Sequence, residues 1–211
     1  KQPKRAIVAG PGNPPVVVDQ TADLDQAARS IIEGGGFDNN LLCIGEKEVF
    51  VVESVYDQLV QALQRAGAVQ LNPRQVSALT DASFSYEKDH YVLNKELVGA
   101  DPAVLAEKAG ASASADTELL FGETEVNSPF GGEEQMMPFV PLVRVPDVDS
   151  AIERAIEFEH GFGHTACIHS NDLATITRMG KAVNTTLYVV NGPSTAGLGL
   201  GGEGYLSYSI A

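Results

Sequence analysis

The chain has 211 residues, enough for one large domain or two small ones, and 44% of them are hydrophobic, as is ordinary for a globular protein. Its formal net charge is −14 and its Lys and Arg residues are scattered, so we expect no nucleic-acid partner, because binding phosphates needs clustered cations. No apolar run is long enough to cross a bilayer and no signal peptide opens the chain, which indicates a cytoplasmic protein without a membrane partner.

The two cysteines and the two ends of the sequence set further expectations. Cys43 and Cys167 lie far apart, and two free thiols in a reducing compartment are favoured over a disulfide. The chain has no initiator Met, reaches strand-like residues 6–9 almost at once, and ends in the apolar alternation of residues 207–211. These ends predict a piece cut at a domain boundary.

Strands and helices alternate along the first third. Residues 16–18 form a short β-branched run, and Asp23 then opens a helix with Gln26 three residues later, which is a capping-box pattern. The glycines 34–36 are expected to stop this helix. Residues 49–52 predict a strand buried on both faces, and Ser54 is expected to cap the helix that follows it and ends near residue 67.

The remaining elements predict the class of fold. Residues 72–85 hold a helix after Pro73, residues 101–109 hold a short helix, and residues 110–116 form a surface loop, not a domain linker, because a strand at residues 119–121 follows directly. Strands at residues 140–145, 165–168 and 187–190 alternate with helices opened by Asp147 and Asp172. This alternation predicts a single three-layer αβα domain with a mostly parallel sheet and right-handed crossovers.

Cys43 is the first candidate for chemistry. It follows the polar turn Phe37-Asp38-Asn39-Asn40 and precedes a strand, so the turn can hold its thiol outward at a strand end, where open α/β folds bind ligands. Asn39 and Asn40 supply amide donors and tolerate left-handed backbone. The alternative is a buried, merely packed thiol, which spacing alone favours here and favours strongly for Cys167, between Ala166 and Ile168 in a strand.

Four other segments leave functional and structural interpretations open. The loop Gly10-Pro11-Gly12-Asn13-Pro14-Pro15 is either a rigid turn or the lining of a pocket, and Glu133 with Glu134 is a solvated acidic pair unless other evidence intervenes. The histidines at 160, 164 and 169 invite a metal-site hypothesis, but no Cys or carboxylate cluster completes one, so we expect no metal. The glycines of residues 197–202 match G-x-G-x-x-G, yet the strand-like residues 205–210 follow in place of a helix, which argues against a dinucleotide site.

In order along the chain, these segments resemble the aldehyde dehydrogenase superfamily, and within it the CoA-acylating enzymes of bacterial microcompartments. The resemblance covers nearly the whole sequence. It is carried by Gly10 to Pro15, Ser30-Ile31-Ile32-Glu33-Gly34, Phe37 to Leu41 with Cys43-Ile44 and Glu46-Lys47, Glu134-Gln135-Met136-Met137-Pro138, His164-Thr165-Ala166 with Ile168-His169-Ser170, and Asn191-Gly192-Pro193-Ser194 with Gly201-Gly202-Glu203-Gly204.

The resemblance implies an aldehyde dehydrogenase catalytic-domain fold and a role for each matching residue. Cys43 stands at the position of the nucleophile that attacks the aldehyde, so the resemblance favours a reactive thiol over a merely packed one. The backbone N–H of Cys43 would form half of an oxyanion hole. Glu134 matches the residue that binds the cofactor ribose, and Met136 the position near the nicotinamide. The other implied residues are the cofactor-binding loop and the substrate pocket, namely Gly10, Pro11, Gly12, Asn40, Leu42 and Ile44. His164 either assists the incoming thiol or positions its loop, and the second role is slightly favoured.

Ala9 decides the subclass that the resemblance implies. Hydrolytic members carry a glutamate at the aligned position, and without that base CoA becomes the acceptor of the acyl group, so the implied cofactors are NAD and coenzyme A. Close relatives have Pro in place of Leu42. The resemblance further implies that residues 1–211 are the thiol-bearing catalytic domain and that the nucleotide-binding domain is absent from this chain. The full-length protein would be a homo-oligomer that contacts a microcompartment shell through a segment outside the chain.

Three hypotheses follow in order. The first is an acylating dehydrogenase that converts propionaldehyde, acetaldehyde or lactaldehyde to its acyl-CoA. The second is a hydrolytic or phosphate-dependent relative with the same cysteine chemistry. The third is a non-catalytic α/β module with an ordinary, unreactive Cys43.

Overall fold

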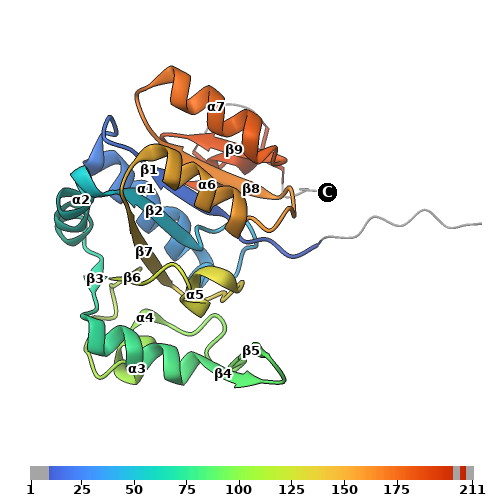
Figure 1. The fold of residues 1–211 in the computed structure, drawn as a ribbon. Helices are drawn as coiled ribbons and strands as arrows, with labels where there is room; N and C mark the ends of the chain where they lie inside the picture. The colour runs from blue at the N-terminus through green and yellow to red at the C-terminus, as the bar shows by residue number, and fades with distance from the viewer. Residues whose placement is uncertain (1–9, 202–204, 208–211) are drawn as a thin grey trace, which may run out of the picture.

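The computed structural model describes residues 10–201 and 205–207, and a seven-stranded sheet runs through the middle of this part of the chain (Figure 1). The strand order is β3-β6-β7-β2-β1-β8-β9, and each neighbouring pair is parallel. The strands are β1 (Pro15–Val18), β2 (Glu48–Val52), β3 (Val69–Gln70), β6 (Leu120–Glu123), β7 (Phe139–Val145), β8 (Thr165–His169) and β9 (Leu187–Val190).

Two pairs of helices cover the two faces of this sheet, which explains why its central strands are mostly apolar (Figure 1). On one face, Val16 and Val18 of β1 pack with α1 (Leu24–Gly36) and α2 (Glu53–Arg65). On the other face, Val17 packs with α6 (Val148–Phe158) and α7 (Leu173–Val183). The predicted three-layer αβα domain with a parallel sheet is confirmed.

A third apolar cluster lies beside β6 and β7 and joins α3 (Pro73–Ser83), α4 (Pro102–Lys108) and the short α5 (Pro129–Gly132). Phe130 stands edge-on to Phe84 at 4.9 Å between ring centroids and tilts against Phe139 at 4.6 Å. Phe84 starts a hairpin of β4 (Phe84–Glu87) and β5 (His90–Leu93). The hairpin was not predicted, because its turn residues Lys88 and Asp89 adopt positive φ without the Asn-Gly or Asp-Gly signal of such turns.

The helix α1 ends at the last of its three glycines, Gly36, as expected. None of the three adopts the left-handed conformation of a glycine cap. A Cβ at Gly34 would lie 2.0 Å from the carboxylate Oε2 of Glu46, and a Cβ at Gly36 would lie 2.9 Å from the carbonyl oxygen of Glu118. These two glycines therefore also allow close packing of the helix end.

Other helix ends divide between confirmed and corrected predictions. Asp23, Asp147 and Asp172 each cap a helix through a side-chain oxygen, as expected. Ser54 does not cap α2, which begins one residue earlier without a side-chain cap. The second half of the expected capping box is also missing, because Gln26 Nε2 donates to the Asn191 carbonyl oxygen (2.7 Å).

Some predictions fall on undescribed residues or on irregular segments. The strand expected at residues 6–9 and the second half of the one expected at residues 205–210 lie outside the described residues, and residues 205–207 have no regular structure. A 3-10 turn, η2 (Ser194–Leu198), extends into the first two residues of the glycine-rich segment. Within residues 10–201 and 205–207, no helix combines the length and apolar composition needed to cross a bilayer.

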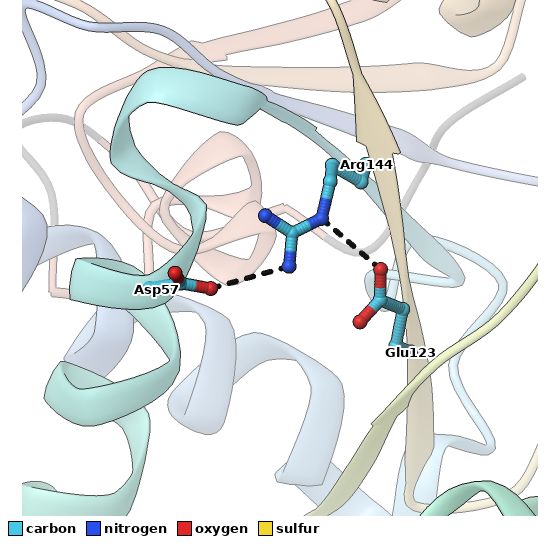
Figure 2. A network of polar contacts seen from close by, with 3 residues as sticks. All are labelled: Asp57, Glu123 and Arg144. Atoms are coloured by element: carbon cyan, nitrogen blue, oxygen red, sulfur yellow. Dashed lines mark hydrogen bonds and ion pairs between the residues drawn. The ribbon is translucent and has the colours of Figure 1, made fainter.

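An exposed polar network ties α2 to the sheet (Figure 2). Arg144 of β7 donates from Nε to Glu123 (3.1 Å) and from a terminal nitrogen to Asp57 (3.2 Å). Its guanidinium carbon also lies 3.8 Å from the ring centroid of Tyr56. The network lies at the carboxyl-terminal ends of β6 and β7, away from the residues that the sequence indicated as candidates for chemistry.

Candidate active site

The predicted site residues gather at the amino-terminal ends of four neighbouring strands. Gly12 precedes β1, Cys43 precedes β2, Glu134 precedes β7 and His164 immediately precedes β8. These strands stand in the order β7-β2-β1-β8 and are all parallel, so the segments that enter them meet at one edge of the sheet. The expected position of Cys43 at a strand end is at the amino-terminal end, whereas ligands of open α/β folds generally bind at the carboxyl ends of the strands.

The turn before Cys43 is held in an unusual backbone conformation. Asp38, Asn39 and Asn40 have φ of 49°, 52° and 60°, which is the left-handed region. Each such residue costs about 1–2 kcal/mol relative to the right-handed form, somewhat less for Asn and Asp, whose short side chains bond locally. Here Asn39 Nδ2 donates to the Gly99 carbonyl oxygen (3.0 Å) and to Asp101 Oδ1 (2.9 Å), which offsets part of that strain.

Asn40 and Lys47 close the turn from inside. Asn40 is fully buried, and its Nδ2 donates to the Glu46 carbonyl oxygen (2.9 Å). The ammonium group of Lys47 donates to the Asn40 carbonyl oxygen (3.0 Å) and to Asn40 Oδ1. Both ends of the Asn40 amide are thus engaged by protein groups. Of the other two expected pocket residues, Ile44 is buried and Leu42 is half-buried.

Cys43 and Cys167 are both free thiols but differ in surroundings. Cys167 is fully buried in β8, in line with its packed interpretation. Cys43 is half-exposed, and burial, followed by the nearby Glu134 carboxylate, raises its pKa, while the Lys47 ammonium group opposes that rise. The thiol is therefore mostly protonated at neutral pH and needs a base or a stronger positive field to become a nucleophile.

Glu46 connects the Cys43 turn to the segment that follows β9. Its two carboxylate oxygens accept from the backbone N–H and the hydroxyl of Ser194, both at 2.8 Å. The carboxylate is completely buried against Gly34, and burial raises its pKa to about 7. The Glu46 side chain thus brings together the motifs that contain Gly34, Glu46 and Ser194, which are far apart in the sequence.

Glu134 reaches the site from the loop before β7. It is half-buried, and burial raises its pKa, while Lys47 and a hydrogen bond from the Gly12 backbone lower it. Its neighbour Gln135 anchors the loop by donating to the carbonyl oxygens of Lys47 (3.1 Å) and Phe139 (3.2 Å). A half-exposed carboxylate on an anchored loop suits a ribose, whose hydroxyl groups are hydrogen-bond donors.

Met136 follows in the same loop with φ of 48°, and its carbonyl oxygen accepts from Gly99 N (2.9 Å). The side chain of Met136 is half-buried. The loop is therefore held on both sides of Gln135.

Gly12 packs closely against both Cys43 and His164. A Cβ at Gly12 would lie 2.7 Å from the Cys43 carbonyl oxygen and 3.1 Å from the His164 ring, whereas Gly10 and Pro11 are exposed. His164 donates its backbone N–H to Glu159 Oε1 (2.8 Å), and its Nδ1 bonds the Thr165 hydroxyl (2.8 Å).

Burial lowers the pKa of His164, so the ring is a neutral imidazole at pH 7. Because Nδ1 is engaged by the Thr165 hydroxyl, Nε2 is the nitrogen left to meet a ligand. In the tautomer in which Nδ1–H donates to the Thr165 hydroxyl, Nε2 carries no hydrogen and can accept a proton.

Sequence reasoning quoted Lys47 and Gln135 only as parts of motifs and gave them no role. A signal was present, since Glu46-Lys47-Glu48 carries three charges into a strand expected to be buried on both faces. The structure shows all three side chains fully buried.

Fold and site together define an α/β domain with a half-exposed thiol, a neutral imidazole and a carboxylate at one edge of a parallel sheet. The aldehyde dehydrogenase family model matches residues 1–204, and the chain belongs to that family.

Its relatives include CoA-acylating enzymes. The acetaldehyde dehydrogenase (acetylating) EutE of Salmonella typhimurium is 44% identical over 209 residues, which are 98% of this chain and 45% of that protein. The chain thus spans about half the length of the curated relatives it matches.

Two solved structures support the same placement. The propionaldehyde dehydrogenase of Rhodopseudomonas palustris with bound propionyl-CoA has a TM-score of 0.93 and 44% identity, covering 99% of this chain and 46% of that one. A propionaldehyde dehydrogenase from the fucose utilisation microcompartment of Clostridium phytofermentans has a TM-score of 0.90 and 39% identity, covering 99% and 47%. The predicted resemblance to CoA-acylating aldehyde dehydrogenases is confirmed.

Proposed function

We propose that the protein carrying this chain oxidises a short-chain aldehyde to its acyl-CoA, with CoA as the acyl acceptor and NAD as the oxidant. Residues 1–211 form its thiol-bearing catalytic domain, and the nucleotide-binding domain belongs to the part of the relatives' length that this chain does not match. The names of the similar proteins, an acetylating acetaldehyde dehydrogenase and two propionaldehyde dehydrogenases, support this activity.

The observation that carries the proposal is the half-exposed thiol of Cys43 on its hydrogen-bonded turn, with Gly12 packed against both the Cys43 backbone and the neutral His164 ring. Another structure of the R. palustris enzyme contains CoA and an acylated cysteine. In the C. phytofermentans enzyme, one cysteine and one histidine have each been replaced by alanine. A thiol and an imidazole are what acyl transfer to CoA requires.

Each group has a defined task in this chemistry. Cys43 Sγ, once deprotonated, forms a bond to the aldehyde carbon, and the Cys43 backbone N–H stabilises the resulting oxyanion. NAD, when bound, accepts the hydride from that carbon, and Glu134 holds its ribose with Met136 beside the nicotinamide. The product of this half-reaction is a thioester on Cys43.

His164 serves the second half-reaction. It takes the proton of the CoA thiol at Nε2, the CoA sulfur bonds to the acyl carbon, and Cys43 leaves as the thiolate. His164 is suited to this because it is neutral at pH 7. This assigns it a chemical task in place of the structural role that the sequence slightly favoured.

CoA is preferred over water on the basis of residue 9. Ala9 lies outside the described residues, so the preference rests on the sequence, where an alanine stands at the position of the hydrolytic base. The aldehyde is acetaldehyde, propionaldehyde or lactaldehyde, which differ by groups worth about 1–3 kcal/mol in a pocket. NADP is a second candidate oxidant, because an engineered glycolyl-CoA reductase that is 43% identical to this chain has NADP+ bound.

The test is NADH formation by the full-length protein with propionaldehyde, with and without CoA, for the wild type and Cys43→Ala. The proposal expects activity that needs CoA and disappears in the variant. Turnover with water or phosphate in place of CoA would establish the hydrolytic or phosphate-dependent alternative, and full activity of Cys43→Ala would reject Cys43 as the nucleophile. A location inside a bacterial microcompartment, like that of the similar C. phytofermentans enzyme, is part of the same proposal.

A further inference from the structure

Lys47 has no role in the chemistry above, yet its side chain is fully buried and its charged end lies at the Cys43 turn. Its Nζ donates to the Asn40 carbonyl oxygen (3.0 Å), to Asn40 Oδ1 and to the Leu42 carbonyl oxygen (3.4 Å). An ammonium group has three N–H bonds, so these acceptors use all of them. Two of the three acceptors are backbone carbonyl groups within three residues of Cys43.

The backbone of Lys47 is engaged as well. Its carbonyl oxygen accepts from Gln135 Nε2 (3.1 Å), and its N–H donates to the Pro14 carbonyl oxygen (3.1 Å). Gln135 adjoins Glu134, and Pro14 follows the loop that contains Gly12. Lys47 is therefore the one residue among those described that hydrogen-bonds to the Cys43 turn and to the segments before β1 and β7.

Four titratable groups lie near the Lys47 ammonium group, and they differ in how they interact with its charge. Its ammonium group is faced by Glu134, Glu46, Cys43 and Glu48, and burial lowers its pKa to about 8. Glu46 also accepts two hydrogen bonds from Ser194, and burial raises the pKa of Glu48, which favours its uncharged form. Glu134 has the largest of the four electrostatic effects on Lys47, and Cys43 is among the other three groups that raise its pKa.

Glu134 also limits how strongly this charge acts on the thiol. Its carboxylate raises the pKa of Cys43, whereas Lys47 lowers it. Among the described residues, Lys47 is the only cation whose charge acts on Cys43 in this way. An interaction of two charges is reciprocal, and accordingly Cys43 raises the pKa of Lys47.

We propose that Lys47 is a positioning residue for Cys43, whose buried ammonium group holds the carbonyl groups ahead of Cys43 and supplies the positive charge that favours its thiolate. This inference rests on the proposed function, since it assumes that Cys43 must become a thiolate. The experiment must separate the effect of the positive charge of Lys47 on Cys43 from the effect of its hydrogen bonds to the turn.

The experiment measures alkylation of Cys43 by iodoacetamide from pH 6 to 10 in the intact protein without aldehyde, NAD or CoA, read by intact mass. Iodoacetamide is uncharged, and the buried Cys167 gives no competing signal. The variants are Lys47→Met, which removes charge and donors, Lys47→Gln, which keeps donors only, and Lys47→Arg, which keeps both. Lys108→Met removes an exposed charge at the end of α4 and is the matched control.

We expect Lys47→Met and Lys47→Gln to slow alkylation at pH 7 roughly tenfold, because one pKa unit changes the thiolate fraction about tenfold. Lys47→Arg recovers most of that rate. The difference between the wild type and the Met and Gln variants should shrink above pH 8, because the Lys47 ammonium group, with its pKa of about 8, loses its charge there. A difference that stays the same across the pH range, or Lys47→Gln behaving as the wild type, overturns the proposal and leaves Lys47 a structural clamp.

A second variant covers the case in which none of the Lys47 variants folds, as checked by thermal unfolding. Glu134→Gln removes the competing carboxylate and leaves the ammonium group to Cys43, so alkylation at pH 7 should become faster. An unchanged or slower rate contradicts the shared charge. The readout does not involve CoA, so wild-type protein without CoA-dependent NADH formation would reject the proposed function and not this inference.

Discussion

Replacing Gly34 by Ala inside α1 is expected to destabilise the fold, against the ordinary preference of helices. In an unconstrained helix interior, Ala is better than Gly by about 0.5–1 kcal/mol. Here the new Cβ would lie 2.0 Å from Glu46 Oε2 and 2.2 Å from Oε1, far inside contact distance. Glu46 is a flexible side chain, but it is fully buried and both of its oxygens are held by Ser194 at 2.8 Å.

Two responses are open to the protein, and both cost stability. If Glu46 leaves Ser194, buried polar groups lose their partners at about 1–3 kcal/mol or more for a charged group. If it stays, the helix must shift, which costs about 1–3 kcal/mol in a packed interior. After subtracting the helix preference of about 0.5–1 kcal/mol, we expect a net loss of about 0.5–2 kcal/mol in the free energy of unfolding.

The assay is urea unfolding followed by far-UV circular dichroism, with midpoint and slope compared. Gly132→Ala is the matched control, because a Cβ at Gly132 meets nothing within 4 Å, and it should change stability by less than about 0.5 kcal/mol. Equal or higher stability of Gly34→Ala would refute the contact between Gly34 and a fixed Glu46 carboxylate.

Three further changes test other parts of the structure. Glu46→Gln removes a carboxyl group whose pKa in the folded state, about 7, exceeds its ordinary value of 4.5. The stability of the wild type therefore falls as the pH rises between these two values, by about 1.4 kcal/mol per unit of pKa difference. Urea unfolding at pH 5 and at pH 8 should show a smaller fall in the variant. His164→Asn should keep the first turnover of NADH but slow the CoA-dependent steady state about 100-fold, seen by stopped-flow absorbance; an equal loss of both phases contradicts its task. Arg144→Ala should lower the unfolding free energy by about 1 kcal/mol through Asp57 and Tyr56, and no change in urea midpoint would refute that.

The sequence alone was enough to predict the layered architecture, because continuous apolar strands alternated with helices that carried clear caps. It was also close to sufficient for the position of the site. Cys43, Glu134 and His164 were each recognised as lying just before a strand, and parallel neighbouring strands must bring such segments to one edge. The general rule for open α/β sheets pointed to the opposite edge, since it describes loops that follow strands.

What failed were inferences from residue type alone. The glycines 34–36 were interpreted as a helix stop and the helix does end at Gly36, but only the tertiary neighbours Glu46 and Glu118 reveal why glycine is needed at 34 and 36. The hairpin turn at Lys88 and Asp89 has positive φ without the residues that usually announce it. Such contacts and conformations depend on long-range packing, which a local pattern does not contain.

If Cys43 carries the acyl group between the aldehyde and CoA, the acyl transfer should also run in reverse, from an acyl-CoA to Cys43. Full-length protein is mixed with propionyl-CoA in the absence of NAD and aldehyde, and its intact mass and peptide map are recorded. The account predicts the addition of one propionyl group, located on Cys43 and absent from Cys43→Ala. Wild-type protein that stays unmodified, or carries the group on another residue, would contradict it.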